Sequence, residues 1–290
     1  MLTILFDGIA YGMLLFVLAV GLAVTMGLMN FINLAHGAFA MAGGYITVLL
    51  MQHLGVPFLM CLPLAFAGSA LLGAVLERTL YRPMYKKPHL DQVLFSIGLT
   101  FMAVASVDYF IGSSQQIMQL PAFLKGRTEI GSGAWMLGMG HYRLFIIAVC
   151  AVLTLALQYV LTRTRFGSRL RASVDDQRVA AGLGINVNVV FLSTFAVGSG
   201  LAGLGGALGA EVLGLDPGFP LKFMIYFLIV VAVGGTTSIT GPLLAALLLG
   251  VADVAGKYYI PKMGAFIVYS LMIAILIWRP QGLFVRKGGR

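Results

Sequence analysis

Long apolar runs, separated by short polar segments, make up most of this chain. A helix that crosses a membrane needs about 20 consecutive, mainly apolar residues. Nine segments have this pattern, and they lie near residues 5–29, 33–52, 58–79, 93–112, 144–162, 188–210, 222–240, 241–255 and 264–279. The pattern predicts an all-α, polytopic membrane protein with about 8–10 transmembrane or re-entrant helices.

Basic residues lie beside three of these runs. Thirteen of the 19 Lys and Arg form groups at residues 78–87, 163–178 and 279–290. Cytoplasmic loops of membrane proteins carry an excess of Lys and Arg. We therefore expect residues 80–91, the loop 163–187 and the C-terminus to be cytoplasmic, and the glycine-rich loop 113–143 to lie on the outer face.

The first 57 residues allow two arrangements. If both early segments cross the membrane fully, the N-terminus lies outside, and if one of them is re-entrant, it lies inside. The first Lys or Arg is Arg78, so the N-terminus lacks the basic region of a secretory signal. We expect the first helix to be retained.

Composition agrees with a chain that is solvated by lipid. Hydrophobic residues make up 60% of the 290 residues and charged residues only 10%, whereas soluble domains are about 25% charged. The longest polar loop has about 30 residues, too few for a core of its own. We expect one transmembrane domain over residues 1–290. The net charge is +9, and most of the Lys and Arg residues flank the apolar runs. This placement favours anionic lipid or a cytoplasmic protein as a partner, and not nucleic acid.

Motifs for catalysis and energy coupling are absent from the sequence. No G-x-x-x-x-G-K-[ST] loop occurs, so the chain is not expected to hydrolyse nucleotide. The acidic residues lie near predicted helix ends or in loops, whereas ion-driven carriers place carboxylates deep in the membrane. The four His lack metal-ligand spacing, and no nucleophile–base pair is evident. We expect no enzyme activity, no metal and no cofactor.

The sequence GSGLAG at residues 198–203 matches the G-x-G-x-x-G dinucleotide motif, but it lies inside an apolar helical run. The motif binds a dinucleotide only between a strand and a helix. Small residues at every fourth position instead let two membrane helices approach closely. The spacing predicts a helix-packing stripe that consists of Gly198, Ala202, Gly206 and Ala210.

A polar, glycine-rich break, GGTTSITGP at residues 234–242, separates two apolar runs, and a similar break follows the first run near residue 30. Paired broken helices indicate a transport site in transporters built from repeats. This reading places Gly234, Gly235 and Thr236 on the substrate pathway. The alternative is a tight hairpin between two helices.

Residues 162–188, TRTRFGSRLRASVDDQRVAAGLGINVN, combine a strongly charged surface with an intermittent apolar edge. The pattern predicts a short helix across the cytoplasmic face, and its glycine-rich end indicates a docking element. The alternative is a solvated loop that only sets the topology.

Three separated motifs resemble the LivH-type permeases, which are membrane subunits of the bacterial branched-chain amino acid ABC importers. The motifs are NFINLAHGAFAMAGGY, TRFGSRLRASVDDQRVAAGLGINVN and GGTTSITGPLLAALLLG, in this order before a terminal WRPQGLF. The resemblance covers nearly the whole chain. It implies a type II ABC importer-like permease of the bacterial inner membrane for branched-chain or related amino acids. The implied partners are two ATPase subunits, a second permease subunit and a periplasmic substrate-binding protein.

The resemblance also implies that the loop 163–187 docks into an ATPase cleft. ATP binding would close the ATPase pair, and rigid docking helices would transmit this motion to the membrane helices. The residues carried over for this coupling are Arg165, Gly167, Arg171, Asp175, Ala181, Gly182 and Gly184.

Within NFINLAHGAFAMAGGY, Asn30, Asn33 and His36 are spaced three apart, which places them within an arc of about 120° on a helix. We expect this polar face to line the substrate pathway or a gate against the second permease. The alternative is that the three residues satisfy helix ends or bond to a neighbouring helix. The glycines that follow would permit a break or a tight crossing, and the candidate region includes Gly37, Gly43, Gly44 and Tyr45.

Two other classes of function stay open. An ion-coupled secondary transporter would accumulate solute in vesicles without ATP and would stop when an uncoupler is added. A passive channel for a small neutral solute, such as urea, would conduct without either energy source.

Overall fold

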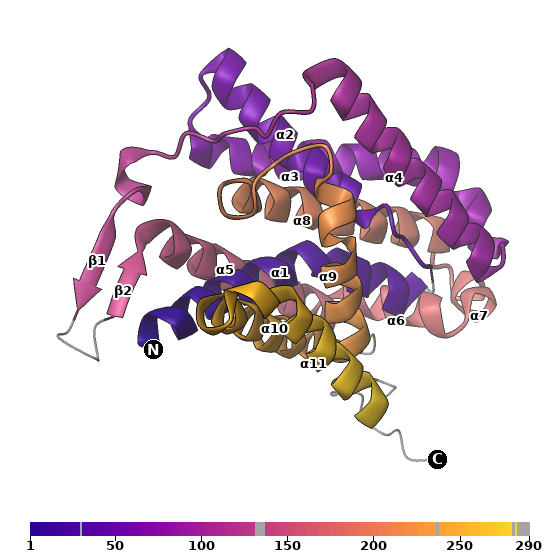
Figure 1. The fold of residues 1–290 in the computed structure, drawn as a ribbon. Helices are drawn as coiled ribbons and strands as arrows, with labels where there is room; N and C mark the ends of the chain where they lie inside the picture. The colour runs from indigo at the N-terminus through magenta and orange to yellow at the C-terminus, as the bar shows by residue number, and fades with distance from the viewer. Residues whose placement is uncertain (30, 131–136, 236–237, 280–281, 283–290) are drawn as a thin grey trace.

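α-Helices account for nearly all the regular structure of the chain (Figure 1). The computed structural model describes residues 1–29, 31–130, 137–235, 238–279 and 282. The helices of this described part are α1 Leu2–Met29, α2 His36–Leu54, α3 Phe58–Leu76, α4 His89–Ile111, α5 His141–Arg163, α6 Arg165–Asp175, α7 Gln177–Gly182, α8 Val187–Leu213, α9 Phe219–Gly234, α10 Thr240–Tyr259 and α11 Gly264–Trp278. A π-helix, η1 Glu77–Tyr81, and a 3-10 helix, η2 Arg82–Lys86, continue α3.

Seven helices in the described part of the chain are long and apolar enough to cross a membrane. They are α1, α2, α3 with its continuation, α4, α5, α8 and α10. Two further apolar helices are shorter, namely α9 and residues 266–278 of α11. Each of the nine predicted segments therefore corresponds to a helix, and the prediction of an all-α polytopic membrane protein is confirmed.

α1 and α8 form the centre of the bundle. Within the most apolar 18-residue stretch of each helix, 83% of the residues are buried in α1 and 61% in α8, against 11% in α4 and 17% in α5. Lipid tails solvate apolar side chains as well as protein does, so a membrane helix can stay apolar without protein around it. α4 and α5 thus present the faces that suit contact with lipid.

Small residues bring the central helices into close contact. α2 crosses α8 where Gly43 faces the backbone of Gly203. The predicted stripe on α8 is buried between its neighbours and consists of Gly198, Ala202, Gly206 and Ala210. Because no hydrophobic effect drives helices together in lipid, such close van der Waals contact stabilises the bundle.

Residues 113–143 contain a β-hairpin where the sequence predicted only a loop. β1 Arg127–Ile130 pairs antiparallel with β2 Leu137–Gly140. Strands of four residues are too short for a periodic pattern to identify. The backbone N–H of Gly138 donates to Oγ1 of Thr3 at 3.0 Å, which ties the hairpin to the start of α1.

The bundle has two ends, which we name the hairpin end and the loop end (Figure 1). The hairpin end carries β1, β2 and the start of α1. The loop end carries α6, α7 and the segment 77–88 between α3 and α4. There the ring of Tyr85 lies edge-on to that of Phe191 in the first turns of α8, with the centroids 5.9 Å apart. The basic segments 80–91 and 163–187 therefore share one end.

α9 and α10 are antiparallel neighbours. Gly234 at the end of α9 lies against Pro242 in the first turn of α10. Further along, the hydroxyl of Tyr226 donates to Oδ1 of Asp253 at 3.4 Å. The end of α9 therefore lies directly against the start of α10.

Candidate functional site

A non-helical segment, residues 31–35, joins α1 to α2. α1 ends at Met29 and α2 begins at His36. The prediction that Asn33 and His36 share a helix face is therefore wrong, and Asn30 lies outside the described residues. Oδ1 of Asn33 accepts the backbone N–H of Ala35 at 3.1 Å. Such local bonds from an asparagine compete with helix formation, which explains why the helix starts late.

α2 begins about halfway along α1. Nε2 of His36 lies 2.8 Å from the carbonyl oxygen of Leu18. Leu18 precedes the end of α1 by eleven residues, which corresponds to about 16 Å along the helix axis. Residues 31–35 therefore run back from the loop end into the bundle. Non-helical backbone at this depth needs partners within the protein, because lipid supplies none.

Three polar residues of α4 supply those partners. Gln92, Ser96 and Thr100 are all buried and lie at intervals of four on one face of the helix. The backbone N–H of Ile32 donates to Oε1 of Gln92 at 3.3 Å, and that of Leu34 donates to Oγ of Ser96 at 3.1 Å. The hydroxyl of Thr100 donates to the carbonyl oxygen of Leu34 at 3.5 Å. This α4 polar stripe holds the non-helical segment in place.

Asn33 holds the other side of the segment. The hydroxyl of Tyr81 donates to Oδ1 of Asn33 at 3.0 Å. Tyr81 is fully buried and ends the π-helix η1, and π-helical turns often occur at functional positions. Its ring also lies edge-on to that of Phe31, with the centroids 5.5 Å apart. Asn33 and His36 therefore both bond to neighbouring elements within the bundle.

The glycines of α2 allow other segments to lie directly on the helix. Gly37 lies against Pro220 in the first turn of α9, and Gly44 lies against the side chain of Leu215. Tyr45 is buried beside them, and its hydroxyl has no hydrogen-bond partner among the described residues. This region is thus a tight crossing of three elements.

The second predicted pathway region lies at the turn between α9 and α10. Gly234 is buried, and Gly235 has a φ of +80°, a conformation that favours glycine. Thr236 lies outside the described residues. This region and the break after α1 belong to different elements of the bundle.

The predicted coupling segment forms two helices, α6 and α7, across the loop end. Thr164 alone separates α6 from α5, and Leu170 anchors α6 because its side chain is completely buried. The guanidinium of Arg171 donates to the carbonyl oxygen of Leu161 in α5. Gly167 lies against the same stretch of backbone. α6 is therefore fixed to the end of α5.

α7 carries exposed apolar side chains at the outer edge of this helix pair. Oδ1 of Asp176 accepts the backbone N–H groups of Arg178 and Val179 at 2.7 and 3.0 Å, a favourable cap for a helix start. The exposed fraction is 59% for Val179 in α7 and 74% for Leu183, which directly follows the helix. The remaining predicted coupling residues are also exposed, namely Arg165, Asp175, Ala181, Gly182 and Gly184.

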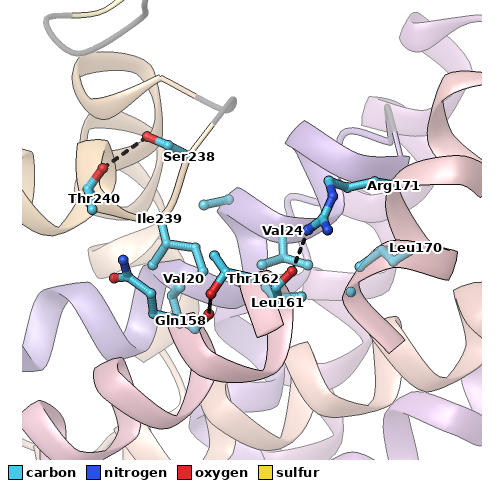
Figure 2. Close-up of a pocket in the computed structure, with 12 residues that line it drawn as sticks. Val20, Val24, Gln158, Leu161, Thr162, Leu170, Arg171, Ser238, Ile239 and Thr240 are labelled. Carbon is cyan, nitrogen blue, oxygen red and sulfur yellow. Dashed lines mark hydrogen bonds between the residues drawn. The ribbon is translucent and has the colours of Figure 1, made fainter. Parts of the chain in front are cut away.

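A cavity of about 260 Å³ separates α6 from the turn that precedes α10 (Figure 2). Figure 2 shows Arg171 on one side, Ser238 and Thr240 on the other, and Val24 of α1 between them. Arg171 and Gly167, both predicted coupling residues, line this cavity. α6 thus has unfilled space between itself and the membrane helices.

The sequence pattern did not single out the residues that hold the broken segment. A signal for the α4 polar stripe was present, since polar residues at intervals of four in an apolar helix indicate bonds to a neighbouring element. Tyr81 gave no signal, because it lies in a basic segment whose π-helical shape cannot be read from residue types. The residues concerned are Tyr81, Gln92, Ser96 and Thr100.

The long apolar helices and the short helix pair at one end of the bundle are those of a multi-pass membrane protein. The chain matches, over residues 4–276, the family model described as the permease component of a branched-chain amino acid transport system. It belongs to this family of transport permeases.

Relatives of the chain are similar over most of their length. It is 28% identical to the high-affinity branched-chain amino acid transport system permease protein BraD of Pseudomonas aeruginosa, over 97% of this chain and 95% of that protein. It is 26% identical to the corresponding permease protein LivH of Escherichia coli K12, over 97% and 94%. Identity to the permease protein LivM of the same organism is 26%, over 93% and 68%. The resemblance to LivH-type permeases is confirmed, and no solved structure matches the chain.

Proposed function

We propose that this protein is the permease subunit of an ABC importer for branched-chain or related amino acids. It forms the membrane pathway with a second permease subunit, and a periplasmic binding protein delivers the substrate. The observation that carries the proposal is the α6–α7 pair, which is fixed to α5 and exposes Val179 and Leu183. Family membership and the names of BraD and LivH support the substrate class.

Separate ATPase subunits supply the energy in this proposal, and the chain itself hydrolyses no nucleotide. Apolar side chains surrounded by a charged rim are typical of protein–protein contacts. Since Arg171 bonds to the end of α5, a displacement of α6 also moves α5. The cavity beside α6 leaves room for that displacement. ATP binding then biases an equilibrium between two arrangements of the membrane helices.

The charge distribution supports a cytoplasmic loop end, which also makes the C-terminus cytoplasmic. Among the described residues, the loop end carries ten Lys and Arg, which are Arg78, Arg82, Lys86, Lys87, Arg163, Arg165, Arg169, Arg171, Arg178 and Arg279, against four carboxylates, Glu77, Asp91, Asp175 and Asp176. The hairpin end carries six cations, Lys125, Arg127, Arg143, Lys222, Lys257 and Lys262, and six carboxylates, Asp7, Asp108, Glu129, Glu211, Asp216 and Asp253. An excess of Lys and Arg marks the cytoplasmic side of a bacterial inner-membrane protein. The N-terminus, tied to the hairpin by Thr3, then lies outside.

The break between α1 and α2 is the proposed gate. Irregular backbone within the membrane occurs where protein or a cavity surrounds it, and in transporters it marks the substrate pathway. Side-chain bonds hold residues 31–35, so the segment can rearrange without unwinding a helix. The pathway residues in this proposal are Asn30, Asn33, His36, Gly37, Gly43, Gly44, Tyr45, Gly234, Gly235 and Thr236.

A charge placed at the exposed residue directly after α7 is expected to weaken ATPase binding strongly. The test is Leu183→Glu in the full-length chain, expressed with the ATPase subunits of its importer and purified by a tag on the permease. We expect at least about tenfold less ATPase in the eluate, because a buried, unpaired carboxylate costs several kcal/mol at an interface.

Leu54→Glu is the matched control. Leu54 is 70% exposed, close to the 74% of Leu183, but it ends α2 at the hairpin end. This variant is expected to recover as much ATPase as the unmodified chain. If Leu183→Glu and a deletion of residues 168–184 both retain the ATPase, the proposed coupling is wrong. Uphill uptake by vesicles that contain this chain alone would instead identify a secondary transporter.

A further inference from the structure

A second cavity, of about 320 Å³, lies at the hairpin end among α1, α5, α8, α9 and α10. Four charged side chains line it, namely Asp7, Arg143, Asp253 and Lys257. Charged side chains in membrane helices are rare and indicate functional positions. Neither the coupling helices nor the broken segment contribute to this cavity.

The four charges form two ion pairs. Arg143 of α5 contacts the carboxylate of Asp7 in α1. Nζ of Lys257 lies 2.6 Å from Oδ2 of Asp253, one helical turn away in α10. Two carboxylates and two cations give the cavity a net charge of zero.

The carboxylates lie deeper than the cations. The exposed fraction of the side chain is 2% for Asp253 and 19% for Asp7, against 56% for Lys257 and 44% for Arg143. Oδ1 of Asp7 is buried and has no hydrogen-bond partner among the described residues. Arg143 has five N–H donors, so its contact with Asp7 leaves donors free. The cavity thus has its carboxylates toward the base and its cations at the mouth.

The rest of the cavity wall is mainly apolar. It includes Leu14, Ile146, Leu213, Phe223 and Val254. The ring of Tyr11 also lines the cavity, and its centroid lies 5.6 Å from Nζ of Lys257. Aromatic faces attract ammonium groups. A small, mainly apolar site with a few converging polar groups is the usual form of a ligand pocket.

We propose that this cavity is an entry site for zwitterionic aliphatic α-amino acids. The carboxylate of the ligand binds Arg143 and Lys257, its ammonium binds Asp7 and Asp253, and its side chain lies on the apolar wall. A zwitterion brings one charge of each sign and leaves the cavity neutral, whereas a simple acid or amine leaves one charge unbalanced, which is costly in a partly buried site. This inference rests on the proposed function and adds a selective site within the permease itself.

Competition binding to the full-length chain in lipid nanodiscs tests the proposal. The probe is tritiated L-leucine, and the competitors are L-leucine, isocaproate, which lacks the amino group, and isoamylamine, which lacks the carboxylate. We expect L-leucine to compete at least about tenfold better than either analogue, because each analogue loses charge-assisted hydrogen bonds.

Two neutral substitutions at the mouth have matched controls. Arg143→Gln and Lys257→Gln are expected to weaken L-leucine binding about tenfold. Arg127→Gln and Lys222→Gln remove cations at the same end that are also ion-paired, to Glu129 and Asp216, and are 56% and 60% exposed. They do not line the cavity and are expected to bind L-leucine normally.

A steric variant keeps the charges intact. Ala10 lines the cavity and is 3% exposed, so Ala10→Leu fills part of the space without removing any of the four charges. It is also expected to weaken L-leucine binding about tenfold.

The entry site is overturned if the unmodified chain does not bind L-leucine, if isocaproate competes as well as L-leucine, or if the mouth and steric variants bind normally. ATPase recovery, measured on the same variants, is expected to stay unchanged. If these L-leucine results fail while ATPase recovery is unchanged, only the entry site is refuted. If the unmodified chain does not bind the ATPase, the proposed function is refuted.

Discussion

Replacing Gly43 by Leu is expected to prevent the chain from forming a stable helix bundle. A Cβ at Gly43 would overlap the backbone of Gly203 in α8, and backbone cannot turn aside as the end of a side chain can. Overpacking costs about 1–3 kcal/mol where side chains can adjust. With backbone as the obstacle, we expect a loss above about 3 kcal/mol, a large part of the stability of a folded protein. The measurements are the monodisperse fraction after extraction in mild detergent and the midpoint of thermal unfolding.

Gly98→Leu is the matched control for this substitution. Gly98 lies within α4, is exposed, and has no atom within 4 Å of an added Cβ. The change also raises the helix propensity by up to about 1 kcal/mol. The control is therefore expected to extract as well as the unmodified chain. Equal stability of Gly43→Leu and the unmodified chain would contradict the close crossing of α2 and α8.

Membrane segments could be predicted from sequence because lipid imposes a minimum apolar length on any helix that crosses it. Their boundaries depend on individual side-chain bonds. The second helix begins at His36 and not at residue 33, because Asn33 bonds to the backbone of Ala35. Apolar run length carries no information about such a bond.

The two parts of the candidate site differ in how far the sequence could predict them. The helix pair α6–α7 follows from a local pattern of charged and apolar residues between 163 and 187. The partners of the broken segment are distant in sequence: Gln92 is 60 residues from Ile32, and Tyr81 is 48 residues from Asn33. Their pairing depends on how α3 and α4 pack in the fold. A single sequence gives no visible sign of that packing.

Asn33→Ala is expected to disable transport and to lower stability. The variant removes the acceptor for the hydroxyl of Tyr81 and for the backbone N–H of Ala35. Each buried group left without a partner costs about 1–3 kcal/mol, although measured side-chain bonds between membrane helices average about 0.6 kcal/mol. We expect a loss of about 2 kcal/mol and a fall of about 4 °C in the thermal midpoint.

The effect on transport follows from the place of Asn33 in the chain. Residues 31–35 connect α1 to α2, so a segment freed from Tyr81 no longer sets where α2 begins. In cells that carry the complete importer, we expect the initial rate of labelled leucine uptake to fall at least about tenfold. Asn188→Ala removes an exposed amide at the start of α8 and is expected to leave uptake and the thermal midpoint unchanged.

A double variant, Asn33→Ala with Tyr81→Phe, separates the hydrogen bond from the two side chains. Once Asn33 is gone, the hydroxyl of Tyr81 has lost its acceptor, and its removal relieves an unpaired buried group. The double variant is therefore expected to be at least as stable as Asn33→Ala alone, with a coupling energy of about 0.5–1 kcal/mol. Strictly additive losses would mean that Tyr81 and Asn33 act independently, and the broken segment would then owe its position to the α4 polar stripe alone.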